Sequence, residues 1–214
     1  MKFEDVQVYG FKPAIKFMRN PLKSYAKADS DFSQEDGADF VIGPVDYDLA
    51  KRLCKGGSVH SKWMRMVYVW VNVTAPLYIF NELDTYSHIP KSSESTMHTA
   101  YREDFEDIMN CFAPSQDIDV YNAYEEVAKH ISNLQKQYKE ADSVEEKNRI
   151  RWEMKKIIPS GYLQKRGLCL NYETLSLIYS QRKDHRLPEW NTDFVEFINT
   201  LPYAEFIKRS GFVE

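Results

Sequence analysis

The sequence predicts an α+β fold, in which a mixed or antiparallel sheet packs against several long helices. Residues 66–74 (MVYVWVNVT) alternate valines with larger side chains, which is typical of a strand covered on both faces. Residues 120–138 and 144–157 repeat apolar side chains at helical spacing. Residues 170–190 read as a further helix. Many helices combined with one clear strand and a few weaker ones favour the α+β class.

The N-terminal part of the chain contains shorter elements. Residues 6–8 suggest a short strand, and residues 13–18 suggest a helix that Asn20-Pro21 ends. Residues 29–44 are acidic and interrupted by glycine and proline, so we expect a loop near an opening. Residues 46–54 read as a short helix that a glycine pair terminates.

The rest of the chain predicts mainly helices. Residues 77–84 begin a helix directly after the clear strand, and residues 193–199 form a short helix near the C-terminus. The two long helices form one helical segment, residues 119–157. We expect a single domain over residues 1–214, which contains the acidic loop 29–44 and this helical segment.

Composition narrows the class of protein. Apolar residues make up 43% and charged residues 28%, which is the profile of a soluble protein. The net charge of −4 argues against binding of DNA or RNA. No apolar run is long enough for a membrane span, and the first residues have no secretory pattern, so we expect a cytoplasmic protein.

Neither cysteines nor histidines show a metal or disulfide pattern. Cys54, Cys111 and Cys169 are far apart and form no CxxC pair, which predicts reduced thiols. The histidines do not follow a metal-ligand spacing, so we expect no metal. The 14 tyrosines and 12 phenylalanines fit either a cleft for a planar ligand or an ordinary core and interface.

The helix predicted at residues 170–190 carries two polar side chains on an apolar stripe. At about 100° per residue, Asn171, Leu175, Ile178 and Arg182 share one face, with the polar ends about 16 Å apart. Burying these groups is costly unless they are paired. Arg182 therefore binds either an anionic ligand or an internal carboxylate, and Asn171 either contacts a ligand or caps the helix. The internal candidates for Arg182 are Glu173, Asp184 and Glu189.

The order of several short motifs resembles that of a known family. The motifs are NPLKSY at 20–25, SKWMR at 61–65, NELDTY at 81–86, SSESTMH at 92–98, Ile158-Pro159, and NYETL at 171–175 followed by Arg182. They resemble, in order, the R-x-S-Y, S-x-x-E-H, Q-x-x-R-H-R, loop-serine, Leu-Pro and N-x-R-x-L…R motifs of the flavin-dependent thymidylate synthases, the ThyX family. The resemblance covers about 150 residues and is most specific at residues 171–182.

The resemblance implies a function and a set of site residues. ThyX enzymes methylate dUMP at C5 with methylenetetrahydrofolate, FAD and a nicotinamide reductant such as NADPH, and they form homotetramers with shared active sites. By position, the resemblance assigns the pyrimidine nucleotide to Arg182, Ser95 and Asn81, and the cofactor to Asn171, Ser24 and Ser61. It assigns no catalytic residue.

Five positions depart from the family pattern. Asp84 and Tyr86 stand where two arginines bind flavin phosphates, Met64 replaces a glutamate, and Met97 and Glu173 replace arginines. Each charge-assisted hydrogen bond to a phosphate is worth about 1.5–3 kcal/mol, and an added carboxylate repels the pyrophosphate. The charges therefore disfavour FAD binding in the usual way.

Two hypotheses follow from the motifs and their departures. In the first, the chain is a divergent enzyme that uses FAD to methylate C5 of dUMP or a related pyrimidine nucleotide. In the alternative, it is a catalytically degenerate protein of the same fold that binds a nucleotide or a protein partner without FAD chemistry. Ser95 is ambiguous in both, because it either contacts the nucleotide or caps the helix that follows.

Overall fold

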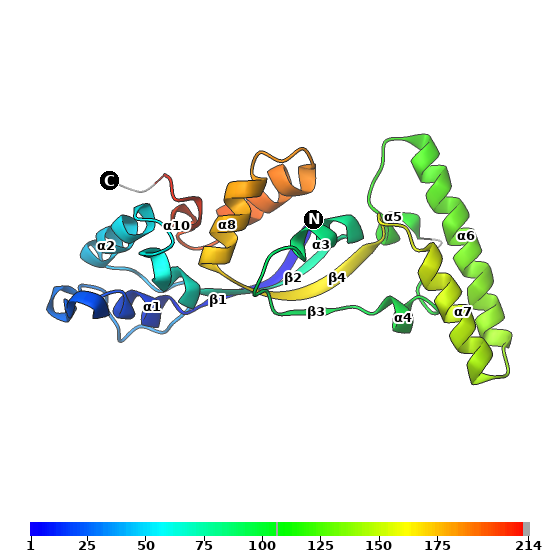
Figure 1. The fold of residues 1–214 in the computed structure, drawn as a ribbon, viewed down its shortest axis with the longest axis horizontal. Coiled ribbons are helices and arrows are strands. Elements are labelled where there is room, and N and C mark those ends of the chain that lie inside the picture. The colour runs from blue at the N-terminus through cyan, green and yellow to red at the C-terminus, as the bar shows by residue number, and fades with distance from the viewer. Residues whose placement is uncertain (106, 212–214) are drawn as a thin grey trace. The chain divides into compact units, whose positions relative to one another are not determined.

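A computed structural model describes residues 1–105 and 107–211, and its contacts divide the chain into two compact units. Unit 1 contains Met1–Val73, Tyr86–Lys91 and the chain from Gly167 onward, and unit 2 contains Thr74–Thr85 and Ser92–Arg166. Figure 1 shows the order of their elements. The chain passes between the units inside three strands and once in the connection between a helix and a strand.

The strands are β1 (Lys2–Tyr9), β2 (Tyr68–Pro76), β3 (Lys91–Ser93) and β4 (Leu163–Asn171). They form an antiparallel sheet in the order β1-β2-β4-β3. The strand expected at residues 66–74 is confirmed as β2, and it lies inside the sheet, but only one of its two faces is fully covered. Its valines Val69, Val71 and Val73 are at most 4% exposed, whereas Tyr68 and Trp70 on the other face are about 40% exposed.

The helices confirm the α+β class. They are α1 (Phe11–Phe17), α2 (Pro44–Lys55), α3 (Leu77–Leu83), α4 (Thr96–Thr99), α5 (Ile108–Cys111), α6 (Ile118–Glu140), α7 (Val144–Ile157), α8 (Tyr172–Arg182), α9 (Val195–Thr200) and α10 (Ala204–Lys208). Short 3₁₀ turns occupy Asn20–Leu22, Tyr25–Lys27 and Ser61–Met66, and a π-helical turn occupies Glu189–Phe194. The two long helices have nearly the predicted bounds.

The turn from β1 into α1 requires glycine at position 10. Gly10 has φ +103°, and a Cβ atom there would lie 2.0 Å from the carbonyl oxygen of Met66. No other residue fits this close approach of two backbones. The glycine thereby lets β1 and α1 meet at a sharp angle beside the start of β2.

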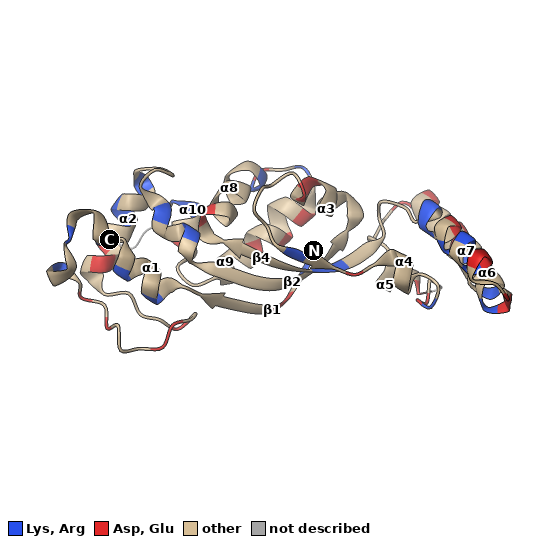
Figure 2. Ribbon diagram, turned by 60° about the horizontal axis from the view of Figure 1, so that its bottom comes forward, with Lys and Arg blue, Asp and Glu red and all other residues tan. Residues whose placement is uncertain are grey.

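In unit 2, α6 and α7 lie side by side as a helical hairpin (Figure 1). Asp117 caps α6 by accepting a hydrogen bond from the backbone of Asp119 at 2.9 Å, and Ser143 caps α7 in the same way from Glu146. Acidic and basic residues are interspersed along both helices (Figure 2), which is typical of helices with a solvated face. The apolar inner stripe explains why the spacing of apolar residues located both helices, and the two caps mark where each helix begins.

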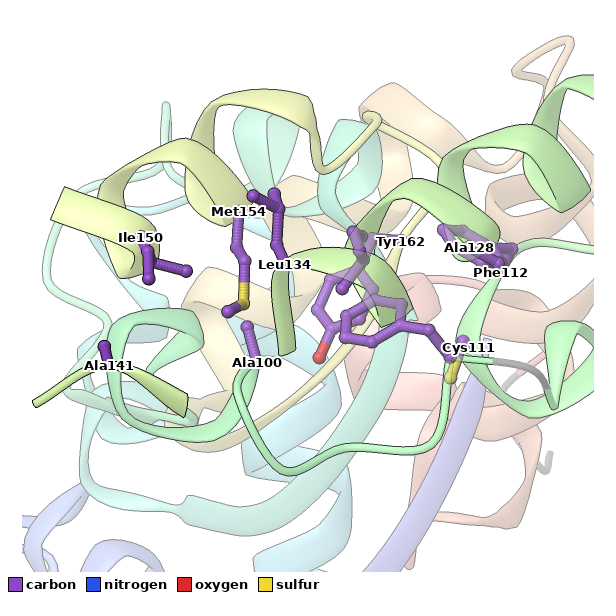
Figure 3. Packing of buried hydrophobic residues seen from close by; sticks show 11 residues of the cluster. Ala100, Cys111, Phe112, Ala128, Leu134, Ala141, Ile150, Met154 and Tyr162 are labelled. Atoms are coloured by element: carbon purple, nitrogen blue, oxygen red, sulfur yellow. The ribbon is translucent and has the colours of Figure 1, made fainter. Parts of the chain in front are cut away.

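The hairpin closes over the core of unit 2. Figure 3 shows Leu134, Ile150 and Met154 gathered between the two helices, with Phe112 and Tyr162 beside them. The Gln135 amide donates to the carbonyl oxygens of Ala100 and Glu103, at 2.7 and 2.8 Å, and so ties the segment before α5 to α6. The core cluster consists of Ala100, Phe105, Cys111, Phe112, Ala128, Ile131, Leu134, Ala141, Ile150, Met154 and Tyr162.

Glu103 at the edge of this core predicts a pH dependence. Burial raises the pKa of its carboxyl group, the hydrogen bond from the Tyr162 hydroxyl at 2.6 Å opposes the rise, and Glu94 adds to it. Because the folded pKa is raised, the stabilising contribution is complete below the unfolded pKa and is lost as the pH rises through the folded pKa. We therefore expect Glu103→Gln to be more stable than the parent at pH 7 but not at pH 4, as measured by urea unfolding.

The matched control for this prediction is Glu140→Gln, because Glu140 is exposed at the end of α6. It should leave the unfolding midpoint nearly unchanged at both pH values. An equal gain from Glu103→Gln at pH 4 and pH 7 would show that ionisation of Glu103 is not the cause.

Candidate nucleotide site

Helix α8 begins where β4 ends, and this junction corrects one prediction. Asn171 has an extended backbone and is the last residue of β4, and its side-chain oxygen accepts a hydrogen bond from the backbone of Thr174 at 2.9 Å. Its placement on the helical stripe was therefore wrong, and its role as N-cap is confirmed. Leu175 and Ile178 are fully buried, as the stripe predicted. The cap leaves the amide nitrogen of Asn171 able to donate to other groups.

Arg182 ends α8 and is held between two aromatic rings. Its Nε donates to the hydroxyl oxygen of Tyr86 at 3.0 Å, and that hydroxyl donates to Gln181 at 2.9 Å. The guanidinium carbon lies 5.2 Å from the centre of the Trp190 ring and 5.8 Å from that of Tyr86. Both contacts are cation–π interactions. The guanidinium thus has a defined position in unit 1.

Two of the internal carboxylates expected to compete for Arg182 are bound by other cations. Glu173 pairs with Arg209 at 2.9 Å, and Asp184 pairs with Lys183 at 2.6 Å. The first pair is half-buried, whereas the second is exposed. The positions of these two acids therefore do not explain why Arg182 stands at the end of the apolar stripe.

The hydroxyl of Tyr86 should contribute measurably to unit 1. Tyr86→Phe keeps the ring under Arg182 but removes one hydrogen-bond acceptor and one donor. We expect the free energy of unfolding to fall by about 1 kcal/mol, measured by chemical denaturation. Tyr25→Phe, at an exposed tyrosine, should have almost no effect. Equal losses of unfolding free energy in Tyr86→Phe and Tyr25→Phe would show that the Tyr86 hydroxyl does not hold Arg182 in place.

Ser61 belongs to a polar network beneath α8. The side chain of Ser61 is fully buried, and its hydroxyl donates to Glu173 Oε2 at 2.9 Å. Arg209 donates to the same oxygen at 2.9 Å, to Ser61 at 3.3 Å, and through Nε to Ser176 at 3.0 Å. Arg209 has a left-handed backbone with φ +52°, which is rare for a residue with a side chain. The network therefore satisfies the acid that stands where the family has an arginine.

A groove of about 430 Å³ lies beside this network. A mostly polar face of α8 lines it with Glu173, Ser176 and Ser180, together with Leu177 and Tyr179, and Lys183 and the end of α10 complete it. The opposite face of α8 carries the buried apolar residues.

Ser24 lies in a segment that a buried ion pair holds in place. Arg19 Nε donates to Asp46 at 2.6 Å, and both side chains are at most 3% exposed. Arg19 Nη1 also donates to the carbonyl oxygen of Ser24 at 3.3 Å. The backbone amides of Asp29 and Ser30 donate to the other oxygen of Asp46, at 3.2 and 2.9 Å. Ser24 itself is half-buried.

Unit 2 contains the other two predicted nucleotide residues. Asn81 is exposed on α3. Ser95 precedes α4 and is exposed, and its carbonyl oxygen accepts from the backbone of His98 and Thr99, but its side chain makes no capping bond. Ser95 therefore stands at the cap position with its hydroxyl unused in capping. The assignments of Asn81 and Ser95 to a nucleotide remain predictions.

Asp84 in unit 2 is neutralised by an arginine. Both of its carboxylate oxygens accept from Arg166 Nη1, at 3.1 and 3.2 Å. Arg166 also donates through Nε to Gln164 at 2.8 Å, and its guanidinium lies 4.0 Å from the centre of the Phe80 ring. The acid that replaces a phosphate-binding arginine of the family thus has an internal partner.

Sequence reasoning missed the residues that complete these pairs. Arg166, Arg209 and Trp190 follow no motif, and the separation of 82 residues between Asp84 and Arg166 carries no periodic signal. The one available signal was chemical, because an acid gained at a semi-buried position requires a cation nearby. That argument predicts that a partner exists but does not say which arginine it is.

The described residues offer little support for a cysteine nucleophile, a metal site or a membrane-spanning helix. Burial raises the pKa of the Cys54 and Cys111 thiols to about 12, so neither is a thiolate nucleophile at neutral pH. Within residues 1–105 and 107–211, His, Cys, Asp and Glu do not gather in threes as metal ligands. In the same residues, each helix is too short or too polar to cross a membrane.

Comparison with known proteins found structural relatives but no sequence relatives. No family model and no curated protein sequence matches the chain. Two structures of the flavin-dependent thymidylate synthase ThyX from Helicobacter pylori, both with FAD and dUMP, match with TM-scores of 0.71 and 0.70. They are 17% and 15% identical to the chain, and each comparison covers 96% of both proteins.

A third structure extends the comparison beyond these enzymes. The UMP/dUMP methylase PolB from Streptomyces cacaoi, bound to 5-Br dUMP, matches with a TM-score of 0.56 at 12% identity. This match covers 97% of the chain and 93% of the methylase. Nearly the whole chain, including the helical hairpin, is aligned in all three cases. The chain therefore has the fold of the flavin-dependent thymidylate synthases.

Proposed function

We propose that this chain binds a pyrimidine nucleotide, with the Arg182 guanidinium as its principal contact. The observation that carries the proposal is the ligand common to the three structural neighbours, since each of them was solved with dUMP or 5-Br dUMP. Arg182 is suited to this role because a bidentate guanidinium recognises phosphate or carbonyl oxygens. Its cation–π contacts keep the guanidinium in a defined position before a ligand binds.

The family resemblance also assigns Ser95 and Asn81, which belong to unit 2, to the nucleotide. Both side chains are exposed, so both are accessible to a ligand. A serine hydroxyl and a carboxamide can each donate to and accept from a base or a sugar. Hydrogen bonds from such neutral groups are weaker than the charge-assisted ones that a guanidinium makes.

The residues at the flavin positions do not fit FAD. A pyrophosphate carries about two negative charges and needs cations or backbone amides. Asp84 is itself an anion paired with Arg166, Tyr86 is bonded to Arg182, and Glu173 is paired with Arg209. An incoming pyrophosphate would have to break the ion pairs of Asp84 and Glu173 and the hydrogen bond between Tyr86 and Arg182. We therefore propose nucleotide binding without FAD pyrophosphate at the family's usual place.

Flavin-assisted methylation of C5 is the second candidate function. Its specific support is the match to a protein described as a UMP/dUMP methylase. This function would require Asn171, Ser24 or Ser61 to help hold the flavin, and it would also need methylenetetrahydrofolate and NADPH. Ser61 fits this role poorly, because its hydroxyl is buried and bonded to Glu173.

Ligand titration of the purified protein distinguishes the two candidates. We expect saturable binding of dUMP or UMP by calorimetry, no comparable binding of dAMP, and a colourless protein that FAD does not stabilise. A yellow protein that releases flavin on denaturation would favour the methylation candidate. Absence of binding of every pyrimidine nucleotide would overturn the proposed function.

A further inference from the structure

A groove of about 830 Å³ lies along strand β1 in unit 1 and is not used by the proposed function. Val6–Tyr9 of β1 form one side, residues 34–40 of the acidic loop form the other, and Thr200–Pro202 close one end. The prediction that the acidic loop lies near an opening is thereby confirmed. A volume of this size is within the range of ligand-binding clefts.

The strand on one side of the groove is the outermost strand of the sheet. β1 pairs with β2, and in the described residues no other strand lies beyond it. Nor does a backbone hydrogen bond from a loop of the described chain reach Val6–Val8. An edge strand of this kind presents a row of amide and carbonyl groups to any extended segment that approaches. Added strands bind to such edges through main-chain hydrogen bonds.

The loop on the other side is held rigidly to the end of β1. Asp36 accepts hydrogen bonds from the backbone of Gly10 at 2.7 Å and of Lys12 at 2.9 Å. The Lys12 ammonium donates to the carbonyl oxygen of Gln34 at 2.8 Å. These contacts fix the loop at a set distance from the strand. The groove is therefore formed before a ligand binds, which lowers the entropic cost of binding.

The side chains along the groove combine buried apolar residues with one acidic wall. Val8, Phe40 and Leu201 line the groove and are at most 5% exposed. Glu35 and Asp39 are exposed on the loop side. None of the lining residues is Lys or Arg, and the neighbouring Lys12 is bound to Gln34. The groove therefore attracts positive charge and repels acidic segments.

We propose that this groove binds an extended basic segment of a partner protein, which adds to β1 as a further strand. In an added strand, alternate side chains point to opposite sides. Apolar residues of the segment would meet Val8 and Phe40, and its lysines or arginines would meet Glu35 and Asp39. The backbone gives affinity, and the two carboxylates select for basic sequence. This proposal does not depend on nucleotide binding.

A fluorescent peptide of alternating lysine and valine, about eight residues long, is the probe for this proposal. We expect saturable binding in fluorescence polarisation, and none for the equivalent glutamate–valine peptide. The double variant Glu35→Lys with Asp39→Lys should weaken binding about tenfold at low salt. The matched control is Glu125→Lys with Glu126→Lys on α6, which makes the same change in net charge in unit 2 and should leave the affinity almost unchanged.

The mode of binding is tested separately from the charge. Hydrogen exchange of the Val6–Tyr9 amides should slow when the peptide is bound, and methylation of alternate peptide amides on the edge facing β1 should abolish binding. Failure to bind the basic peptide, or equal binding to both double variants, would overturn the proposal. Self-association of the free protein that disappears in the Glu35/Asp39 variant would show instead that a second copy covers the groove.

Discussion

Replacing Arg182 with alanine should remove most of the stabilisation of the protein by dUMP. Loss of a charge-assisted contact costs about 1.5–3 kcal/mol, which weakens binding by about 10- to 150-fold. A ligand at 100 times its dissociation constant stabilises the folded state by about 2.7 kcal/mol, and a 100-fold loss of affinity leaves about 0.4 kcal/mol. The dUMP-dependent rise in Tm should therefore fall from several degrees to about one.

Two further variants separate the charge of Arg182 from its packing. Arg182→Lys keeps a positive charge but loses the bidentate geometry, so it should bind dUMP with intermediate affinity. Arg52→Ala removes an exposed arginine that pairs with Asp48 on α2, and it should bind dUMP like the parent. If Arg182→Ala folds and still shows the full shift with dUMP, the assignment of Arg182 is wrong.

Replacing Asp46 with asparagine should cause a large loss of stability in unit 1. The Asp46 carboxylate is fully buried and pairs with Arg19, which is 3% exposed. Removing one partner of a buried pair leaves the other charge uncompensated, at a cost of about 3–5 kcal/mol. For a chain of this size, Tm should fall by about 6–20 °C in differential scanning calorimetry. Ser24 should become more accessible, because Arg19 also binds its carbonyl oxygen.

The ion pair also predicts the effect of pH on this variant. Burial raises the pKa of Asp46, but hydrogen bonds from Ser30, Arg19 and the backbone of Asp29 outweigh it, so the pKa lies below its usual value. The stabilising contribution is therefore present above the unfolded pKa and is lost as the pH falls through the folded pKa. The parent should lose stability on acidification, and Asp46→Asn should lack that component.

Matched variants test whether burial of the Arg19–Asp46 pair is the reason for the expected loss of stability. Asp48→Asn removes an acid two residues away whose partner Arg52 is exposed, and it should cost at most about 0.5 kcal/mol. Replacing both Arg19 and Asp46 with apolar residues of similar size should restore much of the stability, because no unpaired charge remains. Equal losses for Asp46→Asn and Asp48→Asn would refute the explanation.

The regular elements of the chain were predictable because their signals are local. The alternating valines of β2 and the spacing of α6 and α7 depend on residues within one or two turns of each other. β4 was not recognised, since its residues 163–171 (LQKRGLCLN) mix charged and apolar side chains without a clear alternation. The helix expected at residues 170–190 was consequently begun too early, and Asn171 was placed on its face instead of at its cap. The expected helix also ran too far toward the C-terminus, since α8 ends at Arg182.

The site was predictable only in part. The ThyX resemblance predicted a role for Arg182, which remains a proposal, and marked the positions that lack the family's arginines. It did not identify Tyr86 and Trp190 as the groups that hold Arg182, because neither occupies a position with that role in the motif. Nor could the sequence show that Asp84 and Glu173 are each neutralised, since the arginines that do so come from distant segments.

By itself, the sequence determined the α+β class, the helical hairpin and a resemblance to ThyX that the fold confirms. It also placed acids and a tyrosine at the positions that the resemblance assigns to flavin phosphates, and such side chains are poor ligands for a pyrophosphate. Only the tertiary structure decided that Asp84 and Glu173 pair with Arg166 and Arg209, and that the acidic loop forms one wall of a groove beside β1. Periodicity records which residues share one element, whereas ion pairs and grooves depend on how distant elements meet.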